Sequence, residues 1–213
     1  MKLIELSIND FINEVDSKKP APGGGSVSAL VSLLGLSLTR MVGHLSISKK
    51  SFDKLPVLIQ AEFVKTMSDF EVQKQALLDL IDEDTLAFNQ MMIAYKMPKT
   101  SDQEVLSRND AIEFATMNGI EVPLQVVSNS IQVLRKVEFF VENGVSSALS
   151  DVGVGILLLS SGLEGAILNM KINLSGIRCE STKEKYLNMI KNLMKEKELI
   201  VKNLMEIIHS KLI

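Results

Sequence analysis

The distribution of glycine and proline, the residues that most often interrupt helices, is the feature that most constrains this chain. Neither residue occurs from Val57 to Met97 or from Ile177 to Ile213, whereas five of them crowd between Pro20 and Gly25. Apolar residues in the uninterrupted stretches recur at spacings of three and four, and no strand–turn–strand rhythm is seen. We therefore expect an all-α fold, a single-domain bundle of long helices over residues 1–213.

The composition argues against several classes of protein. With 213 residues, 46% of them hydrophobic, the chain can bury a sizeable core, and its net charge of −3 disfavours nucleic-acid binding, which needs clustered basic residues. The one cysteine, Cys179, cannot form an intrachain disulfide, and no CxxC motif or nearby histidine indicates a metal or nucleophilic role. His44 and His209 lie outside any HExxH pattern and are expected to be structural or exposed.

Nothing in the chain indicates export or a membrane segment. The first residues, Met1 to Leu6, mix an acid with apolar residues and do not lead into the apolar region of a signal peptide. The two longest apolar stretches, 26–45 and 152–170, each contain charged or polar residues. We expect both to be buried helices, with no membrane partner and a cytoplasmic location.

Helical periodicity assigns most of the chain to helices. The expected segments are 7–15, 26–44, 52–96 as one helix or two in series, 101–118, 123–143, 146–172 and 181–212. Ser7 and Gly144 are expected to cap helices, and Ile120–Val127 is interpreted as a loop that enters a helix at Pro123. A stripe of small residues from Ser28 to Gly43 should let a second helix come close. The amphipathic segment 181–212 should pack on the bundle or on a second subunit.

A glycine run that leads into a helix forms the first candidate site. It consists of Gly23, Gly24, Gly25 and Ser26. Free N–H groups at a helix start attract anions, and glycines let a ligand touch the backbone. The run is not a P-loop, because the GxxxxGK[ST] spacing is missing. The structural alternative is a stiff loop with Ser26 as the N-cap.

The second candidate is Asp84, which helical spacing places inside an apolar stripe. The stripe comprises Phe70, Leu77, Ile81, Phe88, Met91 and Tyr95. A carboxylate there either lines a pocket that raises its pKa, which suits acid/base chemistry, or pairs with a buried cation. The adjacent carboxylates of Asp82 and Glu83 are expected to be solvated.

A third group of polar residues lies on the segment 146–172 and just beyond it. Asp151 shares a face with Gly155 and Gly162, while Asn169 and Asn173 lie one turn apart. Either Asp151 caps the helix and the asparagines bond across a close helix crossing, or these groups hold a heterocycle. Two basic clusters, one with Lys50 and one with Lys99, are either solvated or seats for an acidic ligand tail.

Taken in order, these residues belong to a set of short motifs. The set is Ala21-Pro22-Gly23-Gly24-Gly25-Ser26-Val27, Asp84-x-x-Ala87-Phe88, Met97-Pro98-Lys99, Val122-Pro123-Leu124, Ser150-Asp151 and Asn169-x-x-Ile172-Asn173-Leu174. On these motifs the chain resembles, over nearly its whole length, the cyclodeaminase/cyclohydrolase family. That family comprises the cyclodeaminase portion of formiminotransferase-cyclodeaminase and the stand-alone bacterial methenyltetrahydrofolate cyclohydrolases.

The resemblance implies a helical homodimer that binds a tetrahydrofolate substrate near the subunit interface, with no metal or redox cofactor. One implied reaction closes 5-formiminotetrahydrofolate to 5,10-methenyltetrahydrofolate and releases ammonia. The other opens the methenyl bridge with water to give 10-formyltetrahydrofolate. Both move a proton at a nitrogen beside one carbon, which a pocketed carboxylate can do.

The resemblance also implies roles for individual residues. Asp84 would be the acid/base, and Asp151 would orient or hydrogen-bond the ring system. Residues Gly23–Ser26 and Asn169 would contact the folate. Lys50 and Lys99 would bind its glutamate carboxylates.

Two positions depart from the family pattern. Val145 stands where the family commonly has asparagine, and Cys179 stands where an aspartate is frequent. These departures favour one alternative to an enzyme, a catalytically inactive helical dimer that binds folate or another pteridine. A helical interaction module without a ligand is a further alternative. Such a module would leave Asp84 on its apolar stripe unexplained.

Overall fold

The computed structural model describes residues 2–212, and these residues form α-helices and short 3₁₀ helices with no strand. The α-helices are α1 (Ile8–Val15), α2 (Gly24–Ile47), α3 (Val57–Lys96), α4 (Asp102–Asn143), α5 (Leu149–Leu174) and α6 (Glu180–Lys211), and the 3₁₀ helices are Leu3–Glu5, Phe52–Lys54 and Ser146–Ala148. The all-α prediction is confirmed. Met1 and Ile213, the ends of the predicted domain, lie outside the described residues.

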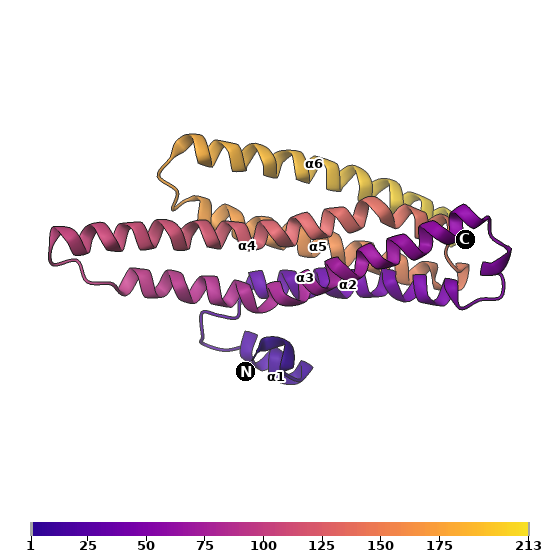
Figure 1. The fold of residues 1–213 in the computed structure, drawn as a ribbon, viewed down its shortest axis with the longest axis horizontal. Coiled ribbons are helices and arrows are strands. Elements are labelled where there is room, and N and C mark those ends of the chain that lie inside the picture. Colours follow the sequence, from indigo (N-terminus) through magenta and orange to yellow (C-terminus); the bar gives the residue numbers. More distant parts are fainter. Residues whose placement is uncertain (1, 213) are drawn as a thin grey trace.

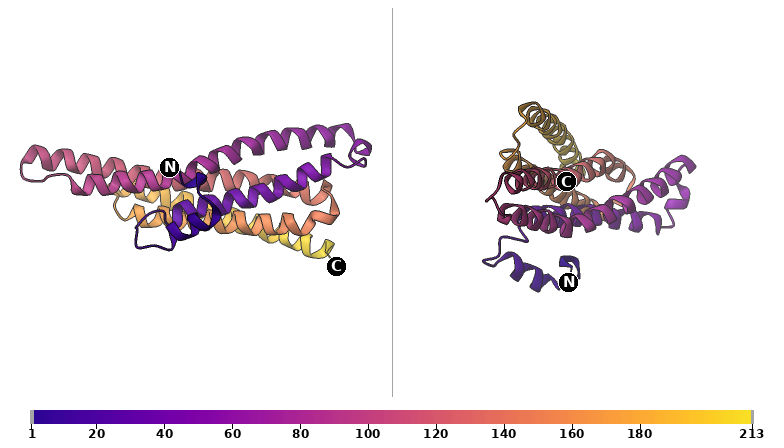
Figure 2. Two further views of the ribbon diagram at one scale, coloured as in Figure 1. Left: turned by 90° about the horizontal axis from the view of Figure 1, so that it is seen from below. Right: turned by 60° about the vertical axis from the view of Figure 1, so that its left-hand side comes forward.

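The core lies among four long helices that run along the long axis of the molecule (Figure 1). Helix α2 packs against α3 and α5, and α4 packs against the same two helices from the other side. Helix α6 covers α4 and α5, which confirms that this amphipathic segment packs on the bundle. Helix α1 lies on the opposite side of the molecule from α6, next to the start of α2 (Figures 1 and 2).

Small residues bring α2 and α5 together, as the sequence predicts. A Cβ atom on Gly35 would lie 2.6 Å from the carbonyl oxygen of Gly155, and one on Gly162 would lie 2.2 Å from the Ser32 hydroxyl. Neither position can carry a larger side chain at this separation. The small-residue face of α2 is therefore the buried one, and the apolar row that contains Leu34 and Met41 faces outward.

The expectation of a loop at Ile120–Val127 is wrong, because α4 continues through it with Pro123 inside the helix. A proline lacks the N–H that would bond to the carbonyl four residues earlier, here that of Gly119. The Asn173 side chain of α5 supplies the missing donor, with its Nδ2 atom 2.6 Å from the Gly119 oxygen. A tertiary hydrogen bond thus replaces the local one and keeps α4 continuous.

Other boundaries follow the sequence closely. Residues 57–96 form one helix rather than two, and Ser7 caps α1 by accepting a hydrogen bond from the Asp10 N–H. The Gly144 N–H bonds to Phe140 at the end of α4, as expected of a cap. Asp151 does not cap α5, since its position is in the first turn and the N-cap residue, Ala148, makes no side-chain cap bond.

Two segments are long and apolar enough to cross a membrane by length and composition, Gly24–Ile47 and Ser146–Leu174. Within the most apolar 18-residue stretch of each segment, 56% and 50% of the stretch, respectively, is buried inside the bundle. Both pack against each other in the core, as the sequence predicts for buried helices.

Candidate active site

The glycine run and Asp84 meet at the start of α2. The Asp84 Oδ2 atom accepts hydrogen bonds from the Ser26 N–H at 2.8 Å and from the Ser26 hydroxyl at 3.1 Å. The Ser26 hydroxyl also lies 3.1 Å from the Thr85 hydroxyl. Ser26 is therefore not the N-cap, which is Gly23. The carboxylate from α3 satisfies one of the free N–H groups in the first turn of α2, and this is why the helix begins two residues earlier than expected.

Gly25 is required by the closeness of this contact. A Cβ atom at this position would lie 1.9 Å from Asp84 Oδ1 and 2.3 Å from its Cγ. Glycine allows the carboxylate to lie directly against the backbone of the first helical turn, whose dipole attracts negative charge. The site thus needs glycine here so that the Asp84 carboxylate can come close, whereas the sequence predicts that close approach for a ligand.

The electrostatics of Asp84 suit proton transfer. Burial raises the pKa of this half-buried carboxyl above its ordinary value, while the two hydrogen bonds from Ser26 act in the opposite direction. Within residues 2–212 no cation pairs with it, so the alternative of a buried ion pair is wrong for the described chain. Its Oδ1 atom receives no hydrogen bond from any described residue, which leaves one oxygen available to a ligand.

Asn169 joins the site from α5. A Cβ atom on Gly24 would lie 3.4 Å from the Asn169 Nδ2, which donates to the Gly165 carbonyl at 3.0 Å. The glycine run therefore lies between Asp84 of α3 and Asn169 of α5. The Asn169 side-chain oxygen and the outer N–H groups of α2 remain for polar atoms of a ligand.

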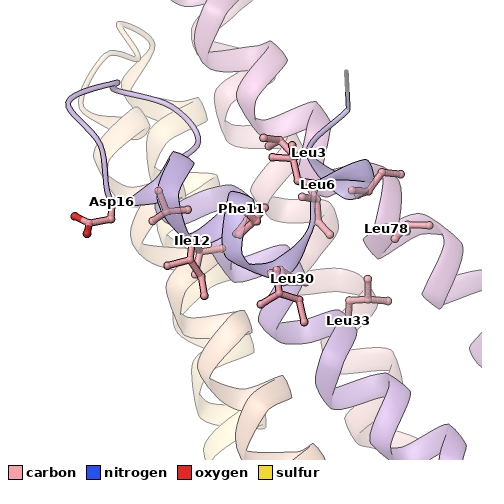
Figure 3. Close-up of a pocket in the computed structure, with 13 residues that line it drawn as sticks. Leu3, Leu6, Phe11, Ile12, Asp16, Leu30, Leu33 and Leu78 are labelled. Atoms are coloured by element: carbon pink, nitrogen blue, oxygen red, sulfur yellow. The ribbon is translucent and has the colours of Figure 1, made fainter.

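An apolar cavity of about 690 Å³ adjoins these residues. Leu30 and Leu33 of α2 and Leu78 of α3 form its inner wall, and the N-terminal segment with Phe11 forms its outer wall (Figure 3). Ile81, one turn from Asp84, also lines it. A volume of this size accepts an organic ring system.

The N-terminal segment is held over the cavity by a residue whose role the sequence did not reveal. The Leu3 N–H donates to Asp82 Oδ1 at 2.6 Å. Asp82 is therefore not solvated as expected, whereas Glu83 is exposed. Only the amphipathic spacing of residues 8–15 hinted that this segment covers an apolar surface. The contribution of Thr85 was also missed, since its hydroxyl carries no sequence signal of its own.

Three of the predicted site residues lie elsewhere in the chain. Asp151 precedes Asn169 by 18 residues on α5, about 27 Å at 1.5 Å per residue. Lys50 follows the far end of α2, about 36 Å from its start, and Lys99 lies in the loop beyond the end of α3. Within one chain, the glycine run Gly23–Ser26 thus lies beside Asp84 and Asn169. Asp151, Lys50 and Lys99 of the same chain lie away from this site.

Among the described residues, no group of three or more histidine, cysteine, aspartate or glutamate side chains is placed to hold a metal ion. The chemistry that these residues offer is that of one carboxyl group with a raised pKa, backbone N–H donors and an amide beside an apolar cavity.

Comparison with known proteins assigns the chain to a family. The family model for formiminotransferase-cyclodeaminase matches residues 7–192. The chain belongs to this family. It is 31% identical over 194 residues to the formimidoyltransferase-cyclodeaminase of Rattus norvegicus and 30% identical over 205 residues to the methenyltetrahydrofolate cyclohydrolase of Methylorubrum extorquens. The family resemblance stated from the motifs is confirmed.

The two relatives differ in how much of them the chain covers. It spans 35% of the rat protein but 97% of the cyclohydrolase, with 91% and 96% of its own length aligned. The crystal structure of formiminotetrahydrofolate cyclodeaminase from Thermotoga maritima superposes with a TM-score of 0.78 at 25% identity, covering 97% of this chain and 96% of that one. The cyclodeaminase-like fold is confirmed.

Proposed function

We propose that this member of the formiminotransferase-cyclodeaminase family is, as one domain, an enzyme of tetrahydrofolate one-carbon interconversion. The leading reaction is cyclisation of 5-formiminotetrahydrofolate to 5,10-methenyltetrahydrofolate with release of ammonia. The observation that carries the proposal is Asp84, a half-buried carboxyl with a raised pKa and one free oxygen, beside an apolar cavity. The relatives' names support the substrate class.

The proposed cyclisation needs one proton moved between two nitrogens. The formimino nitrogen starts out protonated. N10 attacks the formimino carbon, a carbon–nitrogen bond forms, and the carbon–nitrogen double bond becomes single. N10 then loses its proton, the amino group gains one, and the bond from the carbon to that group breaks to release ammonia. Asp84 Oδ1 would take the proton from N10 and deliver one to the departing ammonia. Ser26 holds Oδ2, so the free oxygen keeps a fixed direction throughout.

Hydrolysis of the methenyl bridge is the second candidate. It is supported by the cyclohydrolase relative, which the chain covers over 97% of its length. Water adds to the bridging carbon and one of its protons passes through Asp84 to N5. The bond from that carbon to N5 then breaks, and the remaining hydroxyl proton is released to solvent as the formyl C=O forms, giving 10-formyltetrahydrofolate. The same carboxyl group serves both reactions, since both move a proton at a nitrogen beside one carbon.

We also propose that the chain acts as a homodimer. Support comes from an outward apolar surface on α2 and α5, here called the α2–α5 surface: Leu34, Met41, Leu45, Val154, Leu157, Leu168 and Ile172, each between 37% and 69% exposed. Exposed apolar side chains in such a surface are stabilised when a second copy of the chain covers them. A twofold axis across α5 would make the two copies of α5 antiparallel, and Asp151 of one subunit would approach the glycine run of the other.

The remaining assignments are proposals of the same kind. Under the twofold arrangement Asp151 orients the folate ring system across the interface, and no metal or redox cofactor takes part. The family resemblance implies Lys50 and Lys99 as carboxylate binders, but a single subunit places neither of them beside Asp84. A cytoplasmic location is supported by the lone Cys179 and by the packing of both apolar helices in the core.

The methenyl chromophore provides the test. Purified protein is mixed with 5,10-methenyltetrahydrofolate, and separately with 5-formiminotetrahydrofolate, and the absorbance is followed against the reaction without protein. Faster loss of the chromophore from the first identifies a cyclohydrolase, and its faster appearance from the second identifies a cyclodeaminase. No acceleration of either by the folded protein would contradict an enzymatic function and leave folate binding alone.

A further inference from the structure

Two hollows lie one after the other along the line where α2 packs against α3, and this line is here called the groove between α2 and α3. The two helices run antiparallel, because Ser26 near the start of α2 meets Asp84 on α3, whereas Arg40 further along α2 meets Glu71. The α2 residues along this groove follow at alternating steps of four and three, as one helix face requires. They are Ser26, Leu30, Leu33, Ser37, Arg40 and His44, and the matching α3 residues are Asp84, Ile81, Leu78, Lys74 and Glu71.

The chemistry of the groove changes along its length. At one end lies the free oxygen of Asp84. Next comes the cavity of about 690 Å³, in which the side chains of Leu30, Leu33 and Leu78 project toward the N-terminal segment (Figure 3). Asp16, the one charged residue among the described residues that line the cavity, lies at its edge.

Beyond the apolar section lies a second hollow, of about 530 Å³, whose charged and ionisable side chains are all basic. It is lined by Ser37, Arg40, Met41, His44, Leu45, Ser48 and Lys74. Met41 and Leu45 also belong to the α2–α5 surface, so the hollow borders the proposed dimer interface. Arg40 is largely buried and donates to the Met67 carbonyl at 2.9 Å and to Glu71. Glu71 also accepts from Lys74 at 3.2 Å. The Glu71 carboxylate thus faces the cations of Arg40 and Lys74 and the nearby His44. The Lys74 ammonium keeps donors for a further anion.

We propose that this groove is one elongated binding site, in which Lys74, His44 and Arg40 bind the carboxylates at the acidic end of the ligand whose reacting end lies at Asp84. The inference rests on the proposed function. A tetrahydrofolate carries its reacting nitrogens, an aromatic ring and one or more glutamates in the same order as the polar, apolar and basic sections of the groove.

The distance from Asp84 and the position relative to the apolar cavity favour Lys74 over Lys50 and Lys99, the lysines that the sequence suggests. Lys74 precedes Asp84 by ten residues on α3, about 15 Å, and the apolar cavity lies between them. Lys99 lies on the other side of Asp84, away from the cavity, and Lys50 follows the end of α2. A tail with several glutamates would run from Lys74 toward Arg40 and His44, so each added carboxylate gains basic partners.

The test measures affinity as a function of the number of glutamates. Folic acid with one glutamate and folic acid with three, both unreactive ligands, are titrated calorimetrically into the whole protein. Wild-type protein should bind the triglutamate more tightly. The double variant Lys74→Gln/His44→Gln should lose about tenfold of that preference, since each lost charge-assisted hydrogen bond weakens binding. Lys195→Gln, an exposed lysine on α6, is the matched control and should keep it.

Arg40 is left intact in this design because its burial makes loss of folding the expected result of replacing it. The charge reversal Lys74→Glu is the second variant, and it should weaken triglutamate binding further while the helical circular dichroism stays unchanged. An equal preference in wild type and in the double variant would overturn the inference. So would weak or absent binding of folic acid to wild type, or loss of the preference in Lys99→Gln.

The two proposals fail separately. If the protein accelerates either folate reaction but its glutamate preference does not depend on Lys74 and His44, the elongated site is wrong and the proposed function stands. If the preference depends on those residues but neither reaction is accelerated, the site stands as a folate-binding groove and the enzymatic function fails.

Discussion

At the scale of single residues, the site depends on the contact between a carboxylate and a helix start. Asp84 lies against the backbone of Gly25, receives two hydrogen bonds from Ser26 and keeps one oxygen free. Burial and hydrogen bonding act on its pKa in opposite directions, and burial is the larger. Because its pKa is raised, this carboxyl group holds its proton to a higher pH than a solvated one does, which suits a general acid and base.

Substitution of Gly25 tests the close approach. Gly25→Ala should push the Asp84 carboxylate away from Ser26, lower the free energy of unfolding by about 1–3 kcal/mol as overpacking does, and reduce turnover. Gly24→Ala is the matched control, because its Cβ would lie at an ordinary 3.4 Å from Asn169. It should leave stability unchanged or raise it by up to about 1 kcal/mol. Urea unfolding measures the free energy of unfolding of both variants. Equal changes in that free energy for Gly25→Ala and Gly24→Ala would contradict the account.

The pH dependence of stability tests the direction of the Asp84 pKa. Because burial raises this pKa above the unfolded value of 3.8, the folded chain binds more protons than the unfolded chain between the two values. Wild-type protein should therefore lose stability relative to Asp84→Asn as pH rises above about 3.8, until the raised pKa is passed. Urea unfolding of both proteins from about pH 4 to about pH 8 measures the difference. A gain of wild-type stability relative to Asp84→Asn as the pH rises would show that the pKa is lowered instead.

At the scale of helices, local sequence signals predict the elements but not how they join. The runs without glycine or proline predict α3 and α6 with errors of a few residues, since periodicity alone specifies a long amphipathic helix. The prediction fails at Pro123, where Asn173, 50 residues later in the chain, supplies the donor that proline lacks. It also fails at Ser26, whose N–H partner is Asp84 of another helix. Both errors arise from side chains that reach in from distant segments.

A double-mutant cycle tests the continuity of α4. Asn173→Ala should lower the free energy of unfolding by about 1–3 kcal/mol, because it leaves the buried Gly119 carbonyl without a partner. In a Pro123→Ala background the alanine N–H can satisfy that carbonyl, so the same substitution should cost at least about 1 kcal/mol less. Additive effects of the two substitutions would mean that the Asn173 bond does not replace the missing local one.

At the scale of the whole molecule, the candidate site forms where the start of α2 meets α3 and the C-terminal part of α5. The sequence motifs identify its members Gly23–Ser26, Asp84 and Asn169, because each pairs an unusual residue type with helical spacing. They do not reveal that Asp151 lies at the far end of α5, since short motifs carry no information on which helix ends meet. The hollow with Arg40 and Lys74 was missed because its basic residues come from different helices.

The α2–α5 surface predicts a dimer in solution. Leu157→Lys places a charge in this surface and should convert a dimer to a monomer in size-exclusion chromatography with light scattering. Leu199→Lys, on the exposed side of α6, is the matched control and should leave the mass unchanged. A wild-type protein that is monomeric at all concentrations would contradict the proposed interface and the role of Asp151 across it.

The central claim is that Asp84 performs proton transfer on a tetrahydrofolate, and the turnover number of Asp84→Asn tests it most directly. We predict that kcat on the folate substrate that wild type converts falls by about 10² to 10⁴, the usual contribution of a general acid or base. The helical circular dichroism should stay intact, and Glu83→Gln, which changes the adjacent exposed carboxylate, should keep wild-type turnover. Folded Asp84→Asn protein with wild-type kcat would contradict the claim.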